Sequence, residues 1–249
     1  MNFYSQRKLS VINAVLLVVF AVFLGLNQAV IAEINEKLGI AGPDSLVKFA
    51  SFQKSQTANS EGISLSGDIM DDTVKLVASA GAPAVYGEEL GVSFSQVQQS
   101  INIMKQYDPA YGGQKIILEG DDLKRYTDIG LRIACEYCCG AKSIVFADGS
   151  AACGCAHSIA MRGLMAYLIK NHGDEYSDDE ILRELARWKG MYFPKQMIQK
   201  LSAQLAGQQE FTPDTAALVL GLDLPDYGKG GEVPLPSEIK DLPGMVGGC

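Results

Sequence analysis

The feature that most constrains this chain is a cluster of cysteines near its middle. Of six cysteines in 249 residues, five lie in one short stretch, and a histidine follows them closely. The spacing is C-x2-C-C-x13-C-x-C-x-H, formed by Cys135, Cys138, Cys139, Cys153, Cys155 and His157. Thiols at this density serve as metal ligands, disulfide partners or redox groups, so the fold has to bring them together.

A turn between the two halves of the cluster can bring those halves together. Asp148-Gly149 is a strong hairpin signal, because both central residues of a type I′ turn need a positive φ. A two-residue turn at this point predicts a small β-hairpin, and Gly140 permits the first half of the cluster to bend back towards the second. In that register the facing pairs are Ile144 with Cys153 and Lys142 with Cys155.

Thiolates at this spacing are suitable ligands for a soft metal ion. Four of them can surround a d10 ion at about 2.3 Å, and C-x2-C lets one backbone turn present two sulfurs to one centre. The simplest tetrad is Cys135, Cys138, Cys153 and Cys155. Cys139 and His157 then either replace a member of the tetrad or build a second site. Zinc is the expected metal ion, and copper or an iron–sulfur centre uses the same donors.

Three other uses of the cysteines stay open at this point. An oxidising compartment would allow six cysteines to form three disulfides. A thiol redox protein would cycle Cys135 and Cys138 between dithiol and disulfide, which needs a depressed thiol pKa such as a helix N-terminus provides. In a structural or surface-assembly subunit, the cluster would only staple the fold. We do not include Cys249 in the primary site. It either completes a coordination shell, forms a disulfide with another chain or remains a single free cysteine.

The N-terminal segment predicts attachment to a membrane. Residues 11–32 are almost wholly apolar, and as a helix they would span roughly 33 Å, enough to cross a bilayer core as a signal-anchor. Arg7 and Lys8 precede this segment, so residues 1–10 are expected in the cytoplasm and the body on the extracytoplasmic side. Cleavage after Ala32 would instead release a secreted protein. A polar linker over residues 33–61 follows.

Apolar periodicity predicts a mainly α fold with a small β-hairpin for the exported part. We expect a Cys-rich helical metal-binding domain over residues 62–224 and an extended, poorly packed tail over residues 225–249. Lys115–Leu118 is typical of a short strand. An apolar stripe that starts at Met161 predicts a helix that ends at Gly173. Caps, prolines and glycines predict four further helices, over Ser93–Tyr107, Ser177–Gly190, Pro194–Leu205 and Thr212–Leu220.

Charge and motif content argue against several functions. The chain has 21 Lys and Arg against 29 Asp and Glu, a net charge of −8, so we expect no nucleic-acid partner. It has no G-x-S-x-G, P-loop or dinucleotide motif, and its two histidines leave little for acid–base catalysis. We therefore predict no catalytic residues and no organic cofactor site. The expected partners are the membrane and a protein that the sequence does not identify.

The second half of the cluster has the features of a known group of proteins. Cys153-Gly154-Cys155 is followed by His157 and then by an amphipathic helix pair, whose second member starts with Ser177-Asp178-Asp179-Glu180-Ile181. In these features the chain resembles the small exported bacterial proteins named for a PCYCGC motif, over about residues 135–192. Those proteins are regarded as metal-binding and are often membrane-tethered. The resemblance therefore implies metal binding and a membrane tether for this chain.

Overall fold

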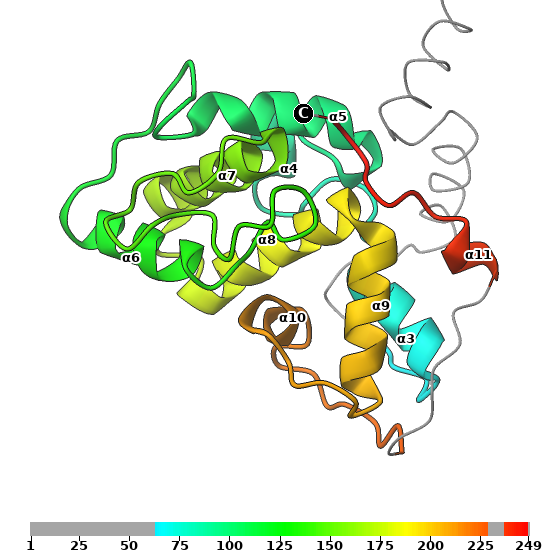
Figure 1. Cartoon of the computed structure of the whole chain (residues 1–249). Helices are drawn as coiled ribbons and strands as arrows, with labels where there is room; N and C mark the ends of the chain where they lie inside the picture. Colours follow the sequence, from blue (N-terminus) through cyan, green and yellow to red (C-terminus); the bar gives the residue numbers. More distant parts are fainter. Residues whose placement is uncertain (1–62, 229–236, 249) are drawn as a thin grey trace, which may run out of the picture.

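The computed structural model describes residues 63–228 and 237–248 (Figure 1). Over these residues the chain is mainly helical, and in place of strands it has two isolated antiparallel bridges, Cys135–Ala141 and Val145–Ala151. No helix within this described part combines the length and the apolar character that crossing a membrane requires. The expected membrane segment 11–32, its flanks 1–10 and 33–61, and Cys249 lie outside the described residues.

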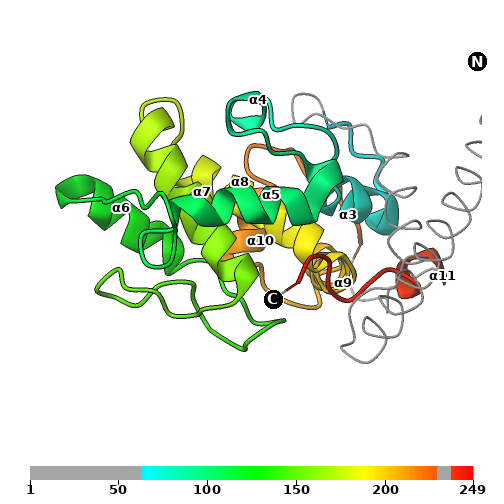
Figure 2. The same ribbon diagram turned by 90° about the horizontal axis from the view of Figure 1, so that it is seen from above.

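The helices pack around a central pair (Figures 1 and 2). The central helices are α7 and α8; α5 and α6 contact α7, α10 contacts α8, and α3 and α9 pack against each other. The elements in chain order are α3 (Ile69–Val77), α4 (Gly87–Leu90), η1 (Phe94–Gln96), α5 (Val97–Met104), η2 (Lys105–Tyr107), α6 (Gly120–Gly130), α7 (Ala156–His172), α8 (Asp178–Tyr192), α9 (Pro194–Leu205), α10 (Pro213–Leu218) and α11 (Ser237–Lys240).

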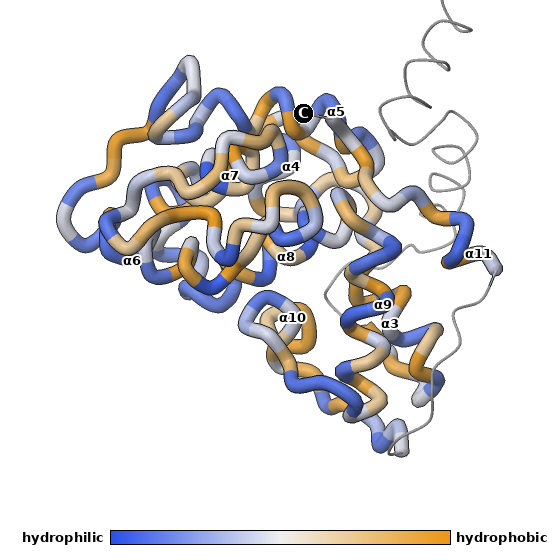
Figure 3. The backbone as a smooth tube through the Cα atoms, in the orientation of Figure 1, coloured by the Kyte–Doolittle hydropathy of each residue, from blue (hydrophilic) through white to orange (hydrophobic). Residues whose placement is uncertain are grey.

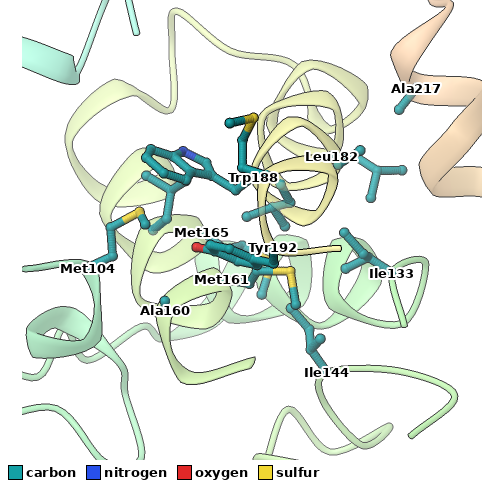
Figure 4. Close-up of a cluster of buried hydrophobic side chains, with 14 of the residues drawn as sticks. Met104, Ile133, Ile144, Ala160, Met161, Met165, Leu182, Trp188, Tyr192 and Ala217 are labelled. Carbon is teal, nitrogen blue, oxygen red and sulfur yellow. The ribbon is translucent and has the colours of Figure 1, made fainter. Parts of the chain in front are cut away.

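Helix α7 forms the centre of the core because it is buried around nearly its whole circumference. Figure 4 shows Met161 and Met165 of α7 in one buried cluster with Trp188 and Tyr192 of α8. Burial of a side chain such as Met161 contributes about 1.5–3 kcal/mol. These two methionines therefore serve the core, as their apolar stripe predicts.

The helix starts predicted from the sequence are confirmed. Ser93 caps the first of them, since its hydroxyl accepts a hydrogen bond from the Ser95 N–H at 3.2 Å. Ser177 and Glu180 form the complete capping box at the start of α8. Pro194 occupies the first turn of α9, where hydrophobic and hydrophilic residues alternate with the helical period (Figure 3). Local caps therefore determine where these helices begin.

Two predicted helix ends are wrong: α10 ends at Leu218 and not at Leu220, and α8 does not end at Gly190. Helix α8 continues past Gly190 to Tyr192. A Cβ atom at Gly190 would lie 2.7 Å from the carbonyl oxygen of Val77, closer than a real contact allows. This glycine therefore permits the close approach of α3 to α8 and does not terminate the helix.

The strand predicted at Lys115–Leu118 is also wrong. This segment has no regular structure, and its backbone is hydrogen-bonded to the end of the preceding helical region. The N–H of Gln114 donates to the carbonyl of Gln106 at 2.7 Å, and that of Ile116 donates to the carbonyl of Tyr107 at 3.3 Å. The run is thus a connecting segment in which Leu118 is buried and Ile117 is exposed, and the N–H of Ile116 is bonded to η2 and not to a neighbouring strand.

The C-terminal tail is packed, not extended, over residues 237–248, whereas residues 225–228 have no regular structure and are partly or fully exposed. Ile239, Leu242 and Val246 are buried, and helix α11 lies within this stretch. The chain then runs back to α5, where the N–H of Gly248 donates to Oε1 of Gln98 at 2.8 Å (Figure 1). The prediction of a poorly packed tail is therefore wrong for residues 237–248. Prolines and glycines limit regular structure there, but they do not prevent apolar side chains from packing.

A buried charge network joins α8, α9 and α10. Nζ of the fully buried Lys189 lies 2.6 Å from Oδ2 of Asp214 and 2.7 Å from Oε2 of Glu136. Lys200 approaches Asp214 Oδ1 at 3.6 Å. Burial by itself would raise the pKa of Asp214, but the charges of Lys189 and Lys200 and the hydrogen bonds it accepts outweigh burial, so the pKa is lowered.

Asp214→Asn is expected to lower the free energy of unfolding by about 2 kcal/mol at pH 7. The carboxylate stabilises the fold above its ordinary pKa of 3.8, and this contribution is lost as the pH falls through the lower folded-state value. Urea unfolding from pH 7 down to pH 2 should therefore show the wild type and the variant converging. Exposed Asp223 supplies the control, since Asp223→Asn should change stability by less than about 0.5 kcal/mol. A difference that stays constant across this pH range would contradict the assignment.

Candidate metal centre

The cysteine cluster occupies the loop between α6 and α7, and its halves meet across a turn at Asp148-Gly149. The N–H of Phe146 donates to the carbonyl of Ser150 at 2.8 Å, and Gly149 has a φ of 80°. The turn therefore comprises residues 147–149, with glycine in the left-handed region, and it is one residue longer than predicted.

This longer turn makes the predicted register wrong by one residue. The N–H of Ala152 donates to the carbonyl of Ile144 at 3.2 Å, so Ile144 faces Ala152 and not Cys153. The predicted pairing of Lys142 with Cys155 fails for the same reason. The arms form a single bridge within the described residues and no ladder, so the expected β-hairpin is reduced to a turn.

A tight turn folds the first half of the cluster. The N–H groups of Cys138 and Cys139 both donate to the carbonyl oxygen of Cys135, at 3.4 and 3.3 Å. Gly140 follows with a φ of 71°, a conformation that glycine adopts without strain, and Ala141 then bridges back to Cys135. The bend predicted at Gly140 is confirmed.

Four thiols, called here the four-thiol set, converge on one centre. Their Sγ atoms all lie within 4.8 Å of one another, and the set consists of Cys135, Cys139, Cys153 and Cys155. The closest approaches are 3.4 Å between Cys135 and Cys155 and 2.6 Å between Cys139 and Cys153. In this set Cys139 takes the place that the simplest predicted tetrad gave to Cys138. Spacing did not distinguish these adjacent residues, because the choice depends on how the turn is folded.

A second donor set shares one thiol with the first. The ligand atoms of Cys138, Cys155 and His157 also lie within 4.8 Å of one another. The side chain of His157 is fully buried, and its Nε2 lies 3.0 Å from the carbonyl oxygen of Val246. The structure therefore brings all six predicted donors to the cluster, in two overlapping sets.

Cys155 is the thiol best placed to be a thiolate. It is the N-cap of α7, and its Sγ accepts a hydrogen bond from the N–H of Ser158 at 3.4 Å. The thiol of Cys135, the imidazole of His157 and that N–H together outweigh burial and lower the pKa of Cys155. The same contact with Cys155, with burial, raises the pKa of Cys135, and burial with the Cys139 contact raises that of Cys153 to about 12. A cation at the centre would favour thiolates at the remaining positions.

Arg162 holds the second half of the cluster from within the core. Its side chain is fully buried, and its Nη1 donates to the carbonyl oxygens of Cys153 at 2.8 Å and Ile144 at 3.2 Å. Its Nη2 lies 2.7 Å from Oδ2 of Asp108, which is also fully buried. Arg162 is not among the residues predicted from the sequence. The signal for it was a charged residue in the middle of an apolar helix, since a buried charge persists only when it is paired.

No known protein family matches the chain, and no curated protein or solved structure matches it. The fold and the cluster define a class, a mainly helical and cysteine-rich protein with a possible metal-binding site. Within that class, the function has to be inferred from the chemistry of the cluster.

Proposed function

We propose that the chain binds a soft metal ion, zinc, through the four-thiol set. The observation that carries this proposal is that thiols from two separate turns converge within 4.8 Å of one another. A tetrahedral ion with metal–sulfur distances of about 2.3 Å holds its sulfurs about 3.8 Å apart. The shortest contacts, at 2.6 and 3.4 Å, reach this spacing by small side-chain movements.

This spacing supports one zinc ion over the other soft metals. An iron–sulfur cluster places several metal ions and sulfides between its thiolates, so its ligands lie further apart than those of a single ion. Four-sulfur tetrahedral coordination is typical of zinc or iron and less so of copper. Zinc therefore fits the four-thiol set best.

The state and exposure of the thiols support reversible binding. Cys135, Cys139, Cys153 and Cys155 are free, so none of the four is consumed in a disulfide. Cys135 is fully buried, whereas Cys139 is exposed. An ion would then be held from the core and reached from solvent, which favours storage or delivery over a purely structural role.

The proposal also includes the cellular location of the cysteine cluster. Residues 11–32 would anchor the chain in the cell membrane, and the cysteine cluster would then lie on the extracytoplasmic side. The resemblance to PCYCGC-motif proteins supports this arrangement. A partner protein on that side would supply the metal ion or receive it.

The full chain, purified in detergent without added metal, is expected to contain at least about one equivalent of zinc or copper by elemental analysis. Replacement by Co2+ should produce the thiolate-to-cobalt absorption of a tetrahedral sulfur site. The double variant Cys135→Ser, Cys153→Ser should lose the absorption that belongs to this four-sulfur site, and Cys249→Ser, which lies outside the four-thiol set, should keep it. A chain that is metal-free and shows no such absorption with Co2+ would contradict the proposal.

A thiol–disulfide function is the second candidate, and one contact favours it. Sγ of the exposed Cys139 lies 2.6 Å from Sγ of Cys153, so this pair replaces the Cys135–Cys138 pair expected from the sequence. The two thiols would form a Cys139–Cys153 disulfide, and their two electrons and two protons would reduce a substrate disulfide, which would leave as two thiols. Reduction of a model disulfide by the metal-free chain separates this candidate from metal storage.

A further inference from the structure

The six donors of the cluster divide into two sets that share one atom, the Sγ of Cys155. A tetrahedral ion takes four ligands, and the four-thiol set already supplies them. Cys138 and His157 are therefore surplus to the first ion, although they lie within 4.8 Å of each other and of Cys155. Their position beside the first centre suits them to bind a separate ion.

The turn at Cys135 distributes two adjacent cysteines between the two sets. Cys138 and Cys139 both donate their N–H groups to the carbonyl of Cys135, so the backbone holds them rigidly next to each other. Cys139 belongs to the four-thiol set, and Cys138 belongs to the second. The turn thus presents one sulfur of this pair to each of two neighbouring centres.

His157 has a buried ring nitrogen that needs a partner. Its Nε2 donates to the carbonyl oxygen of Val246 at 3.0 Å, so the proton is on Nε2 and Nδ1 carries a lone pair. Nδ1 is buried and has no hydrogen-bond partner among the described residues. Leaving such an atom without a partner destabilises the folded state. A metal ion on Nδ1 would satisfy it, and Val246 would be the carbonyl partner that ligating histidines usually have.

Two aromatic rings hold the imidazole of His157 in this orientation. The ring centroid of Tyr192 lies 4.7 Å from that of His157, and the centroid of Phe193 lies 5.0 Å from it. Both aromatic side chains are fully buried, so the imidazole has little freedom to turn. The ring is therefore preorganised beside the thiols of Cys138 and Cys155.

We propose that a second soft metal ion binds beside the first, held by Cys138, Cys155 and Nδ1 of His157, with the Cys155 sulfur bridging the two ions. This inference rests on the proposed function, because the first ion occupies the four-thiol set. A thiolate has lone pairs for two ions, and Cys155 is also supported by the N–H of Ser158. Three protein donors leave one coordination position open, so the second ion is the exchangeable one.

The test is a titration of the full chain in detergent with 113Cd2+, followed by cadmium NMR. The wild type is expected to bind two ions and to give two resonances that are coupled to each other through the shared sulfur. Cys138→Ser should lose the second resonance and the coupling while it keeps the first. The matched variant Cys139→Ser removes the adjacent thiol and should instead perturb the first resonance. Circular dichroism checks that each variant keeps the helical content of the wild type.

His157→Gln is the second variant, because an amide can still donate to the carbonyl of Val246. We expect the affinity for the second ion to fall by about 10–100-fold while the first ion stays bound. Binding of a single ion by the wild type, or two resonances without coupling, would overturn the bridged second site and leave the proposed function standing. A chain that binds no cadmium would instead contradict the proposed function itself.

Discussion

Arg162→Met is expected to lower the free energy of unfolding by about 3–5 kcal/mol. Arg162 and Asp108 form an ion pair at 2.7 Å in which both side chains are fully inaccessible to solvent. Removing the guanidinium leaves the carboxylate buried and uncompensated, and this cost exceeds the loss of the contact itself. The variant also loses the hydrogen bonds to the carbonyl oxygens of Cys153 and Ile144.

Urea unfolding in the presence of a chelator measures this change in stability separately from metal binding. The double variant Arg162→Met, Asp108→Asn is the informative control, because it removes both charges together. The amide oxygen introduced in place of the carboxylate can still accept from the N–H groups of Ala110 and Tyr111, as Asp108 does at 2.6 and 2.9 Å. The double variant should therefore be more stable than Arg162→Met by at least about 1 kcal/mol. Equal stability of the two variants would show that the ion pair is not the source of the effect.

Arg162→Met should also weaken metal binding by about tenfold or more, because outer contacts that orient ligand residues typically contribute 10–100-fold. The carbonyl of Cys153 lies 2.8 Å from Nη1 of Arg162, so loss of this contact frees the backbone that carries the thiol. Competition with a metal indicator under conditions where the variant is folded provides the measurement. An unchanged affinity would mean that the loop that carries Cys153 keeps its conformation without the contact from Arg162.

Gly163→Ala is the second change for which we expect a large effect. A Cβ atom at this position would lie 2.0 Å from the carbonyl oxygen of Met104 and 3.0 Å from the amide nitrogen of Asp108. Both neighbours are backbone atoms, so a rotamer change cannot relieve the overlap, and α7 would have to move away from α5 and η2. This outweighs the gain of about 1 kcal/mol that alanine has over glycine within a helix.

We expect a net loss of about 3 kcal/mol and a fall in Tm of about 6–12 °C, measured by circular dichroism. Gly248→Ala is the matched control, because a Cβ there would meet nothing within 4 Å. It should leave the Tm within about 2 °C of the wild type. A Tm of Gly163→Ala close to that of the control would mean that α7 and α5 are packed less tightly than the structure shows.

Much of the helical fold follows from short segments of sequence. The capping box at Ser177 and the proline at Pro194 mark the starts of α8 and α9 because both signals act within one helical turn. The prediction of helix ends failed where the role of a residue depends on a contact with a residue far away in the sequence. Gly190 is typical of a helix stop, yet it permits contact with Val77, more than a hundred positions earlier.

The candidate site divides in the same way. The sequence motif from Cys135 to His157 identified every donor that the structure places at the cluster. It did not distinguish Cys138 from Cys139, because adjacent residues have equal reach and the turn alone decides where each sulfur lies. The register around Asp148 was wrong by one residue for a related reason, since Gly149 takes a left-handed conformation in a three-residue turn.

The amino-acid sequence by itself determined that this protein is mainly helical, where most of its helices begin, and which six side chains are available to a metal ion. These properties depend on caps, periodicity and residue chemistry that act within a few positions. Only the tertiary structure decided that the donors form two sets sharing Cys155, that Arg162 anchors their loop, and that the tail reaches His157 through Val246. Each of these depends on the packing of segments far apart in the chain, because directed contacts between side chains exist only once the core has formed.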